Sequence, residues 1–271
     1  MLIESLKYLI YGLISGLSEI IPASQRGHQS LLMLLFGMSN RDPMLDLMVH
    51  FGIMACVIFK CKNELAYLTG KGRATQGFSS INRYDRRLLY SAVIPMLVAV
   101  FFVGSGSKYE KLPLSLALFF FINAIILLIP DYIRQSNKNA GQMGPFDSII
   151  IGLSGILSIF PGFSRLGSGC SVAIIRGADR QRTFEWLLLL TVPAMCLLII
   201  TDLIALFSVG LAGISLWLIL GYVLSAAAAF AGSYIGILLM RFLIINNDFS
   251  VFSFYSFGVS FFAFIIYLVA F

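Results

Sequence analysis

Residues 12–28 form an apolar stretch interrupted by side chains that do not belong in hydrocarbon. The stretch reads Gly-Leu-Ile-Ser-Gly-Leu-Ser-Glu-Ile-Ile-Pro-Ala-Ser-Gln-Arg-Gly-His, and Glu19, Pro22, Arg26 and His28 fall within ten positions. A charged side chain at the centre of a bilayer costs roughly 2.5–3.5 kcal/mol on insertion scales. Interrupted backbone is tolerated at that depth only where it lines a protein cavity. The stretch therefore predicts a helix, a break and a second helix around a polar cavity.

A second copy of this pattern lies in the other half of the chain. Aligning Pro22 with Pro161 brings further identical pairs into register, which are Ser15 with Ser154, Gly16 with Gly155, Ile20 with Ile159 and Arg26 with Arg165. Duplicated halves with interrupted helices place a binding site where the repeats meet. We therefore predict repeats over about 1–135 and 136–271, with one site between their breaks.

Composition assigns the chain to membrane proteins. Of its 271 residues 59% are hydrophobic and only 12% are charged, far from the balance of a soluble domain. We predict one integral membrane domain over residues 1–271, an all-α polytopic bundle. The formal charge of +6 resides in short loops, so it indicates orientation in the membrane and no nucleic-acid partner. The cysteines lack metal spacing and are predicted to be reduced packing residues (Cys56, Cys61, Cys170 and Cys196).

Hydrophobic length divides the chain into spans and shorter units. A span needs about 20 apolar residues. Six segments qualify, at about 43–61, 88–104, 112–133, 184–207, 213–241 and 250–270. The interrupted units at 5–38 and 146–176 are too short to cross twice, so each is predicted to be a re-entrant helix–break–helix hairpin. The glycine-containing segment between Lys60 and Arg87 is predicted to be a flexible loop.

The distribution of basic residues predicts the orientation. Alternating the spans places thirteen of the 19 basic residues on one side and four on the other, with Arg26 and Arg165 at the breaks. The side with more Lys and Arg is cytoplasmic by the positive-inside rule. The first unit then enters from outside and the second from inside. The repeats are therefore inverted, and their breaks can converge inside the membrane.

The second break has the composition of an anion site. Arg165 lies within Phe160-Pro-Gly-Phe-Ser-Arg-Leu-Gly-Ser168, where Gly162 and Gly167 allow close backbone approach. A helix that restarts near Ser164 directs free N–H groups at the break, and a guanidinium binds two phosphate oxygens. The alternative is an Arg165–carboxylate pair that joins two helices.

Two further groups of polar residues are candidates for the site. Glu19 is predicted to act as metal ligand, general base or arginine partner, and His28 as nucleophile, proton carrier or hydrogen-bonded structural residue. Asp42, Asp46 and His50 lie on one stripe of a helix. The two acids fit helix capping as well as they fit a site, whereas His50 is a candidate for the pocket wall.

At these residues the sequence resembles the bacterial undecaprenyl-diphosphate phosphatase family of the bacitracin-resistance type. The resemblance is carried by residues 15–28, by Pro161-Gly-Phe-Ser-Arg-Leu-Gly-Ser-Gly169, by Leu45-Asp-Leu-Met-Val-His-Phe-Gly52, by Ile94-Pro95 and by Val192-Pro-Ala-Met195. It implies an inverted-repeat bundle in the bacterial plasma membrane, with a site open to the outer face, and a polyprenyl diphosphate substrate. It also implies a Mg²⁺ or Ca²⁺ cofactor with Glu19 as ligand; a homodimer is a further expectation.

The resemblance divides the site into retained and replaced residues. The retained family residues are Glu19, Ser24, His28, Ser164 and Arg165. The replaced family positions carry Ser15 for a Glu, Gln25 for a Ser, Leu166 for a Ser and Gly169 for a Thr. Catalysis is assigned to Glu19, His28, Ser164 and Arg165. Substrate binding is assigned to Ser24, Gln25, Arg26, His50, Gly162 and Gly167.

Two functional interpretations stay open at the level of sequence. The first is a membrane phosphatase that converts undecaprenyl diphosphate to the monophosphate, as in lipid carrier recycling for peptidoglycan synthesis. The second is a non-catalytic protein of the same fold that binds or moves polyprenyl phosphate across the membrane.

Overall fold

The structure, a computed structural model, describes residues 2–71, 81–133, 136–209, 215–245 and 249–270. All of its named elements in these ranges are helices, which confirms the all-α class. The α-helices are α1 (Leu2–Ile20), α2 (Gln25–Phe36), α3 (Pro43–Lys60), α4 (Lys62–Leu68), α5 (Arg83–Phe101), α6 (Pro113–Tyr132), α7 (Pro145–Leu153), α8 (Arg165–Ile175), α9 (Arg180–Val209), α10 (Leu216–Ile245) and α11 (Ser250–Ala270). The 3₁₀-helices are η1 (Phe102–Tyr109), η2 (Ala140–Gln142) and η3 (Ser154–Ile159).

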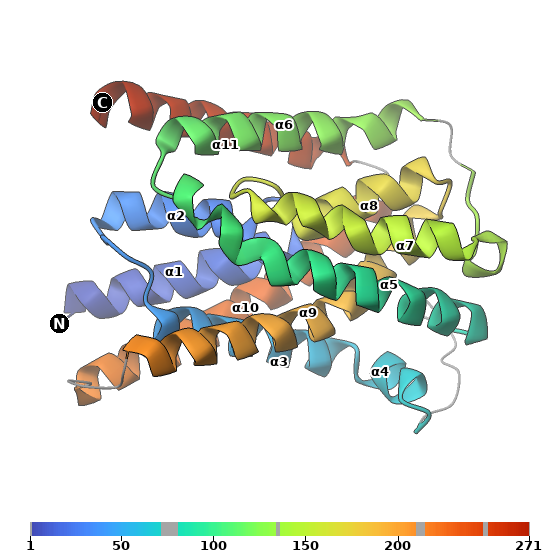
Figure 1. Cartoon of the computed structure of the whole chain (residues 1–271), viewed down its shortest axis with the longest axis horizontal. Coiled ribbons are helices and arrows are strands. Elements are labelled where there is room, and N and C mark those ends of the chain that lie inside the picture. The colour runs from blue at the N-terminus through green and yellow to red at the C-terminus, as the bar shows by residue number, and fades with distance from the viewer. Residues whose placement is uncertain (1, 72–80, 134–135, 210–214, 246–248, 271) are drawn as a thin grey trace.

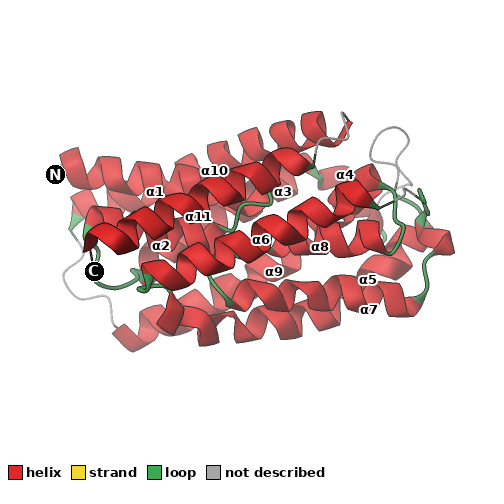
Figure 2. Cartoon of the chain, turned by 90° about the horizontal axis from the view of Figure 1, so that it is seen from above, coloured by secondary structure: helices red, strands yellow, loops and turns green. Residues whose placement is uncertain are grey.

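Six helical segments within the described ranges are long and apolar enough to cross a membrane. Their mean hydropathy lies between 1.6 and 2.4, and they cover Pro43–Lys60, Arg83–Tyr109, Pro113–Tyr132, Arg180–Ser208, Leu216–Ile244 and Ser250–Val269. These segments coincide with the six predicted spans. The chain is therefore a multi-pass membrane protein, and Figure 2 shows its helices running along one long axis.

Local capping sets where several helices begin. The Asp42 side chain accepts hydrogen bonds from the Met44 and Leu45 backbone N–H groups, at 3.0 and 3.3 Å, so the capping interpretation of Asp42 is confirmed. Asn82 caps α5 through a capping box with Asp85. This box starts α5 at Arg83, five residues before the predicted span.

The loop predicted between Lys60 and Arg87 is partly helical. It contains α4 and the first turn of α5, whereas its glycines at 72 and 77 lie outside the described residues. Gly70 lies at the end of α4 with a φ of +78°, a conformation that glycine adopts without steric penalty. The segment is therefore more ordered at both ends than its composition predicts.

Two pairs of helices return the chain to the end from which it came. In Figure 1, α1 runs from the left end to the middle and α2 returns to the left, whereas α7 and η3 run inward from the right and α8 returns to the right. Short breaks at residues 21–24 and 160–164 separate the two arms of each pair. The opposed hairpins have the geometry that two re-entrant units require. Inversion of the repeats stays a prediction.

Close helix packing holds the first hairpin in the bundle. A Cβ added to Gly12 or Gly16 would lie 2.1 Å from the backbone oxygen of Ser225 or Ala229 in α10. Small residues permit this backbone approach, which is a usual basis of helix association in lipid. The hairpin is therefore fixed against a long span, and its break is held in the interior of the bundle.

Candidate functional site

The first break ends at a serine that holds the two breaks together. Ser24 lies before α2 with a φ of +67°, and its Oγ accepts hydrogen bonds from the Gly27 and Gly162 backbone N–H groups, at 3.2 and 3.0 Å. The first bond caps α2, and the second joins residues that are distant in sequence. Ser24 was predicted to bind substrate, but its oxygen already accepts two backbone hydrogen bonds.

The second break has a corresponding cap. Ser164 precedes α8, and its Oγ accepts from the Gly167 backbone N–H at 3.0 Å. The Ser164 hydroxyl can still donate its proton to a further acceptor, because a serine oxygen both donates and accepts. Its backbone N–H donates to Asn123 Oδ1 at 3.0 Å. Ser164 therefore caps α8 and keeps a hydroxyl proton that it can donate at the start of this helix.

The glycines of the site allow the backbones of the two breaks to approach each other closely. A Cβ added to Gly27 would lie 2.9 Å from the Gly162 nitrogen and 2.5 Å from Phe120 Cζ, and one added to Gly167 would lie 2.7 Å from Pro22 Cβ. The Gly162 and Gly167 backbone N–H groups donate to Ser24 Oγ and Ser164 Oγ, and the role of these two glycines in substrate binding stays a prediction. The two breaks are therefore in direct contact, as the duplicated motif predicts.

A buried asparagine of α6 bridges the two breaks. Besides accepting from Ser164, the fully buried Asn123 donates from Nδ2 to the Pro22 carbonyl at 3.4 Å and to Ser256 Oγ at 3.2 Å. Sequence analysis missed this residue. The available signal was a single amide in an otherwise apolar span, where a polar side chain indicates an internal contact.

A cavity lies where the breaks meet. Its volume is about 30 Å³, room for roughly two water molecules at most. Its walls combine five predicted site residues with Phe163 of the second break and residues from four further elements (α5, η1, η3 and α9). The full lining is Glu19, Gln25, Arg26, Val100, Val103, Ser158, Phe163, Ser164, Arg165 and Leu198. Glu19, Ser164 and Arg165 therefore share one cavity, although α1 and α8 are far apart in sequence.

Each break places one arginine on this cavity, and each arginine is paired with a glutamate. Arg165 Nη2 donates to Glu19 Oε1, so the alternative of a helix-joining pair is realised in this state. Arg26 Nη2 donates to Glu110 Oε1, and Arg26 Nη1 donates to the Val103 carbonyl. The arginines occupy matching positions in the two sequence copies, and both have a charged partner.

The Arg26 pair belongs to a larger ionic network that sequence analysis did not find. Arg41 Nε donates to Glu110 Oε2 at 2.7 Å, and Arg41 Nη1 donates to Asp46 Oδ2 at 2.9 Å and Gln29 Oε1 at 3.0 Å. Burial acts to raise the pKa of Glu110, but the guanidinium groups of Arg41 and Arg26 outweigh it, so the pKa lies below its usual value. Glu110 therefore remains ionised at neutral pH.

Gln25 contributes an unsatisfied donor to the cavity. It is buried, lines the cavity, and its Nε2 has no hydrogen-bond partner. A buried amide donor without an acceptor carries a desolvation penalty of roughly 1–3 kcal/mol. An anion that entered the cavity would supply the missing acceptor. Gln25 replaces a family serine, so the position supplies donors here and no hydroxyl.

His28 is not among the residues that line the cavity, and both of its ring nitrogens have partners. Nδ1 is 2.9 Å from the Ser24 carbonyl and Nε2 is 2.6 Å from Tyr255 Oη. A carbonyl can only accept, so Nδ1 carries the proton and neutral Nε2 accepts from the tyrosine. Among the alternatives predicted for His28, this geometry favours the hydrogen-bonded structural residue.

His50 forms an ion pair with an aspartate of α9. Its Nδ1 lies 2.6 Å from Asp202 Oδ2 of α9, and it is not among the residues that line this cavity. The assignment of His50 to the pocket wall and to substrate binding stays a prediction. The helical stripe on which it rested is divided between three partners, because Asp42 caps α3, Asp46 binds Arg41 and His50 binds Asp202.

The donor set does not fit a resident divalent cation. The described residues contain no group of three or more His, Cys, Asp and Glu side chains that could hold one. Glu19 at the cavity already binds Arg165, and Ser15 stands at the position of the family's first Glu, with its Oγ buried and without a hydrogen-bond partner. Mg²⁺ is usually held by one or two carboxylates together with waters and substrate phosphates, so a single carboxylate that already binds an arginine is a poor site in the absence of substrate.

Fold and site together define a polytopic helical membrane protein whose two interrupted units meet at a buried, arginine-lined cavity. The chain belongs to the family described as bacitracin resistance protein BacA, whose model matches residues 8–262.

Curated relatives match over most of their length. They include an undecaprenyl-diphosphatase of Carboxydothermus hydrogenoformans, 28% identical over 93% of both chains. Another is an undecaprenyl-diphosphatase of Prochlorococcus marinus (strain MIT 9312), 29% identical over 76% of this chain and 78% of the relative. Undecaprenyl-diphosphatase 1 of Shouchella clausii is 26% identical over 96% of this chain and 95% of the relative. At these identities the chain is a divergent member, consistent with its replaced residues.

Proposed function

We propose that this protein is an undecaprenyl-diphosphate phosphatase that releases inorganic phosphate and leaves undecaprenyl phosphate in the membrane. The observation that carries the proposal is the pair of arginines, Arg26 and Arg165, that reach one cavity from two breaks beside the unsatisfied amide of Gln25. A guanidinium on each side suits two phosphoryl groups, because each can bind two oxygens. The names of the relatives favour hydrolysis over lipid transport.

Binding of the diphosphate requires exchange of ion pairs. The cavity is too small for a phosphate group, and each arginine is held by a glutamate. The phosphate oxygens therefore have to replace Glu19 at Arg165 and Glu110 at Arg26. The exchange is feasible because it replaces one charged hydrogen bond by another within the same buried site.

Release of Glu19 provides the base for hydrolysis. In this mechanism Glu19 takes a proton from water as the water oxygen attacks the terminal phosphorus. The bond from that phosphorus to the bridging oxygen breaks, and its electron pair stays on undecaprenyl phosphate. Arg165, Arg26 and the Gln25 amide stabilise the charge on the phosphoryl oxygens, the main requirement of phosphoryl transfer. The Ser164 hydroxyl donates to the terminal phosphate, and His28 positions α2.

Cation dependence and location complete the proposal. A Mg²⁺ or Ca²⁺ requirement stays a prediction, and the donor set implies that such an ion would bind chiefly to the diphosphate oxygens. We place the protein in the bacterial plasma membrane with the site facing outward. The cavity wall reaches Val100 and Val103 at the end of α5 and in η1, toward the end of the bundle with fewer basic residues. Homodimer formation also stays a prediction.

The test is phosphate release from undecaprenyl diphosphate by purified protein, with and without Mg²⁺ or Ca²⁺. Arg165→Lys keeps the charge but loses the planar fork, so kcat/KM should fall by roughly tenfold or more. Arg176→Lys is the matched control, because Arg176 pairs with Asp147 at a more exposed position outside the cavity. An exposed pair contributes little, so this variant should stay within about twofold of wild type.

Wild-type protein that binds the diphosphate lipid but releases no phosphate above background contradicts the hydrolase proposal and favours the binding protein. Equal activity of Arg165→Lys and Arg176→Lys contradicts the role of Arg165.

A further inference from the structure

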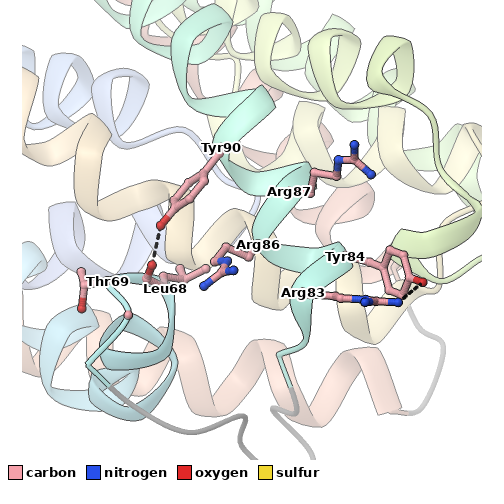
Figure 3. Close-up of a pocket in the computed structure, with 8 residues that line it drawn as sticks. Leu68, Thr69, Arg83, Tyr84, Arg86, Arg87 and Tyr90 are labelled. Atoms are coloured by element: carbon pink, nitrogen blue, oxygen red, sulfur yellow. Dashed lines mark hydrogen bonds between the residues drawn. The ribbon is translucent and has the colours of Figure 1, made fainter.

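A second cationic pocket lies at the other end of the bundle from η1. It has a volume of about 750 Å³ and lies between the end of α4 and the first two turns of α5 (Figure 3). Three arginines line it together with tyrosines and the end of α4, namely Arg83, Arg86, Arg87, Tyr84, Tyr90 and Leu68. The mechanism proposed above uses none of these residues.

The positive charge of this pocket is not compensated by its own walls. Among the described residues that line it, none is acidic. The acid nearest in sequence, Asp85, is buried: its Oδ1 accepts from Trp186 Nε1 at 2.8 Å and its Oδ2 accepts from the Asn82 N–H at 2.8 Å. Arg86 lies over the Tyr67 ring at 5.6 Å, a contact that leaves its charge in place. The pocket therefore attracts an anion.

The depth of the pocket favours the phosphate of a lipid. Arg83 begins a helical segment that is long and apolar enough to cross a membrane, so the three arginines lie at the level where lipid headgroups meet water. In Figure 3 Tyr90 extends toward α4, and its hydroxyl donates to the Leu68 carbonyl. This bond ties the end of α4 to α5 at the pocket.

An apolar path continues from the arginines along the same helix. Tyr90, Ile94, Val98 and Phe101 follow at spacings of three or four residues, and their exposed fractions are 55%, 71%, 49% and 64%. This spacing places them on the face of α5 that also carries Arg83, Arg86 and Arg87. A single ligand that carries a phosphate group and an acyl chain fits both features, with the phosphate at the arginines and the chain along this stripe.

We infer that this pocket binds the phosphodiester headgroup of an anionic glycerophospholipid, with its acyl chain along the exposed stripe of α5. Anionic lipids are concentrated in the cytoplasmic leaflet, and each basic residue near that surface contributes about a factor of five in affinity. The site is separate from the cavity of the proposed reaction, so lipid binding and phosphate release can be lost independently.

The test is native mass spectrometry of the full-length protein in neutral detergent, titrated with phosphatidylglycerol or phosphatidylcholine. Wild type should retain one phosphatidylglycerol in preference to phosphatidylcholine. The variant Arg86→Gln/Arg87→Gln should bind it roughly thirtyfold more weakly, because two charges are removed. Lys62→Gln is the control, an exposed basic residue of α4 that does not line the pocket, and it should bind as wild type does. The single variant Arg87→Gln changes an exposed side chain and should weaken binding about fivefold. It keeps the test valid if the double variant does not fold.

Three outcomes overturn the inference. The first is equal retention of phosphatidylglycerol by wild type and the double variant. The second is displacement of the lipid by millimolar inorganic phosphate, which would mean a free-phosphate site. The third is tighter binding of polyprenyl phosphate than of phosphatidylglycerol at this pocket, which would mean a product site. Phosphate release from undecaprenyl diphosphate is measured in parallel, and it should be unchanged in the double variant. Failure of the lipid inference is thereby distinguished from failure of the proposed activity.

Discussion

Arg26 and Arg165 line one cavity, and each is held there by a glutamate. Their equivalent positions follow from the aligned motifs, and an Arg165–carboxylate pair was one of the predicted alternatives. Glu110, the partner of Arg26, could not be predicted. It lies in a short charged segment, beside Lys108 and Lys111, that is typical of an ordinary loop. Only the turn from η1 into α6 brings its carboxylate to Arg26 and Arg41.

His28 allows a prediction that separates a structural residue from a proton carrier. Tyr255→Phe removes the O–H that donates to His28 Nε2 and leaves this buried nitrogen without a partner. The free energy of unfolding should fall by about 1–3 kcal/mol. Hydrolysis should stay within roughly threefold of wild type, with its pH–rate profile at the same position. Unfolding in mixed micelles and kcat/KM between pH 5 and 9 are the measurements. A displaced profile would show that His28 transfers protons.

The replaced family residues give a second prediction at this scale. Ser15 and Glu19 are one turn apart on α1, so Ser15→Glu places a second carboxylate beside the first. Gln25→Ser restores a hydroxyl at the cavity. The double variant should hydrolyse undecaprenyl diphosphate roughly tenfold faster in Mg²⁺ than without it, because two carboxylates bind the ion better than one. Each single variant is the control. A wild type that already matches the double variant shows that these replacements do not limit turnover.

At the scale of elements, the helix–break–helix units were predictable because their signals are local. Pro22 and Pro161 end the apolar runs, and Ser24 and Ser164 then cap the helices that restart. The contact between the breaks followed from the duplication. The bridge by Asn123 did not, because sequence shows that a polar residue lies in a span but not which element it faces. The contact of Tyr255 with His28 could not be predicted for the same reason, because Tyr255 is one of many aromatic residues in α11.

The contact between the breaks can be tested with a single methyl group. Gly27→Ala would place a Cβ against Phe120 and the Gly162 nitrogen, so the breaks have to separate. Overpacking of this kind should destabilise the protein by about 1–3 kcal/mol and reduce phosphate release together with it. Gly258→Ala is the matched control, because a Cβ at this helical position of α11 meets nothing within 4 Å. Stability and phosphate release are measured for both. Equal behaviour of the two variants contradicts the close contact.

At the scale of the whole molecule, hydrophobic length predicted the six spans, since it is a property of the chain averaged over about 20 residues. Helix ends were less predictable. Asn82 extends α5 by five residues, and η1 prolongs the same span to Tyr109. These ends matter to function because η1 brings Val103 to the cavity and leads to Glu110.

Orientation is the remaining property of the whole molecule that a direct measurement can decide. Lys71 and Lys108 are exposed and lie on opposite sides in the predicted topology, so each is replaced by cysteine in a background without the four native cysteines. Background labelling is weak even where Cys61 is kept, because burial raises the pKa of its thiol to about 12 and the thiolate is the reactive form. With the basic end in the cytoplasm, an impermeant maleimide should label position 108 in intact cells and position 71 only after permeabilisation. Labelling of 71 but not 108 in intact cells would reverse the orientation and would move the proposed phosphatase site to the cytoplasmic face.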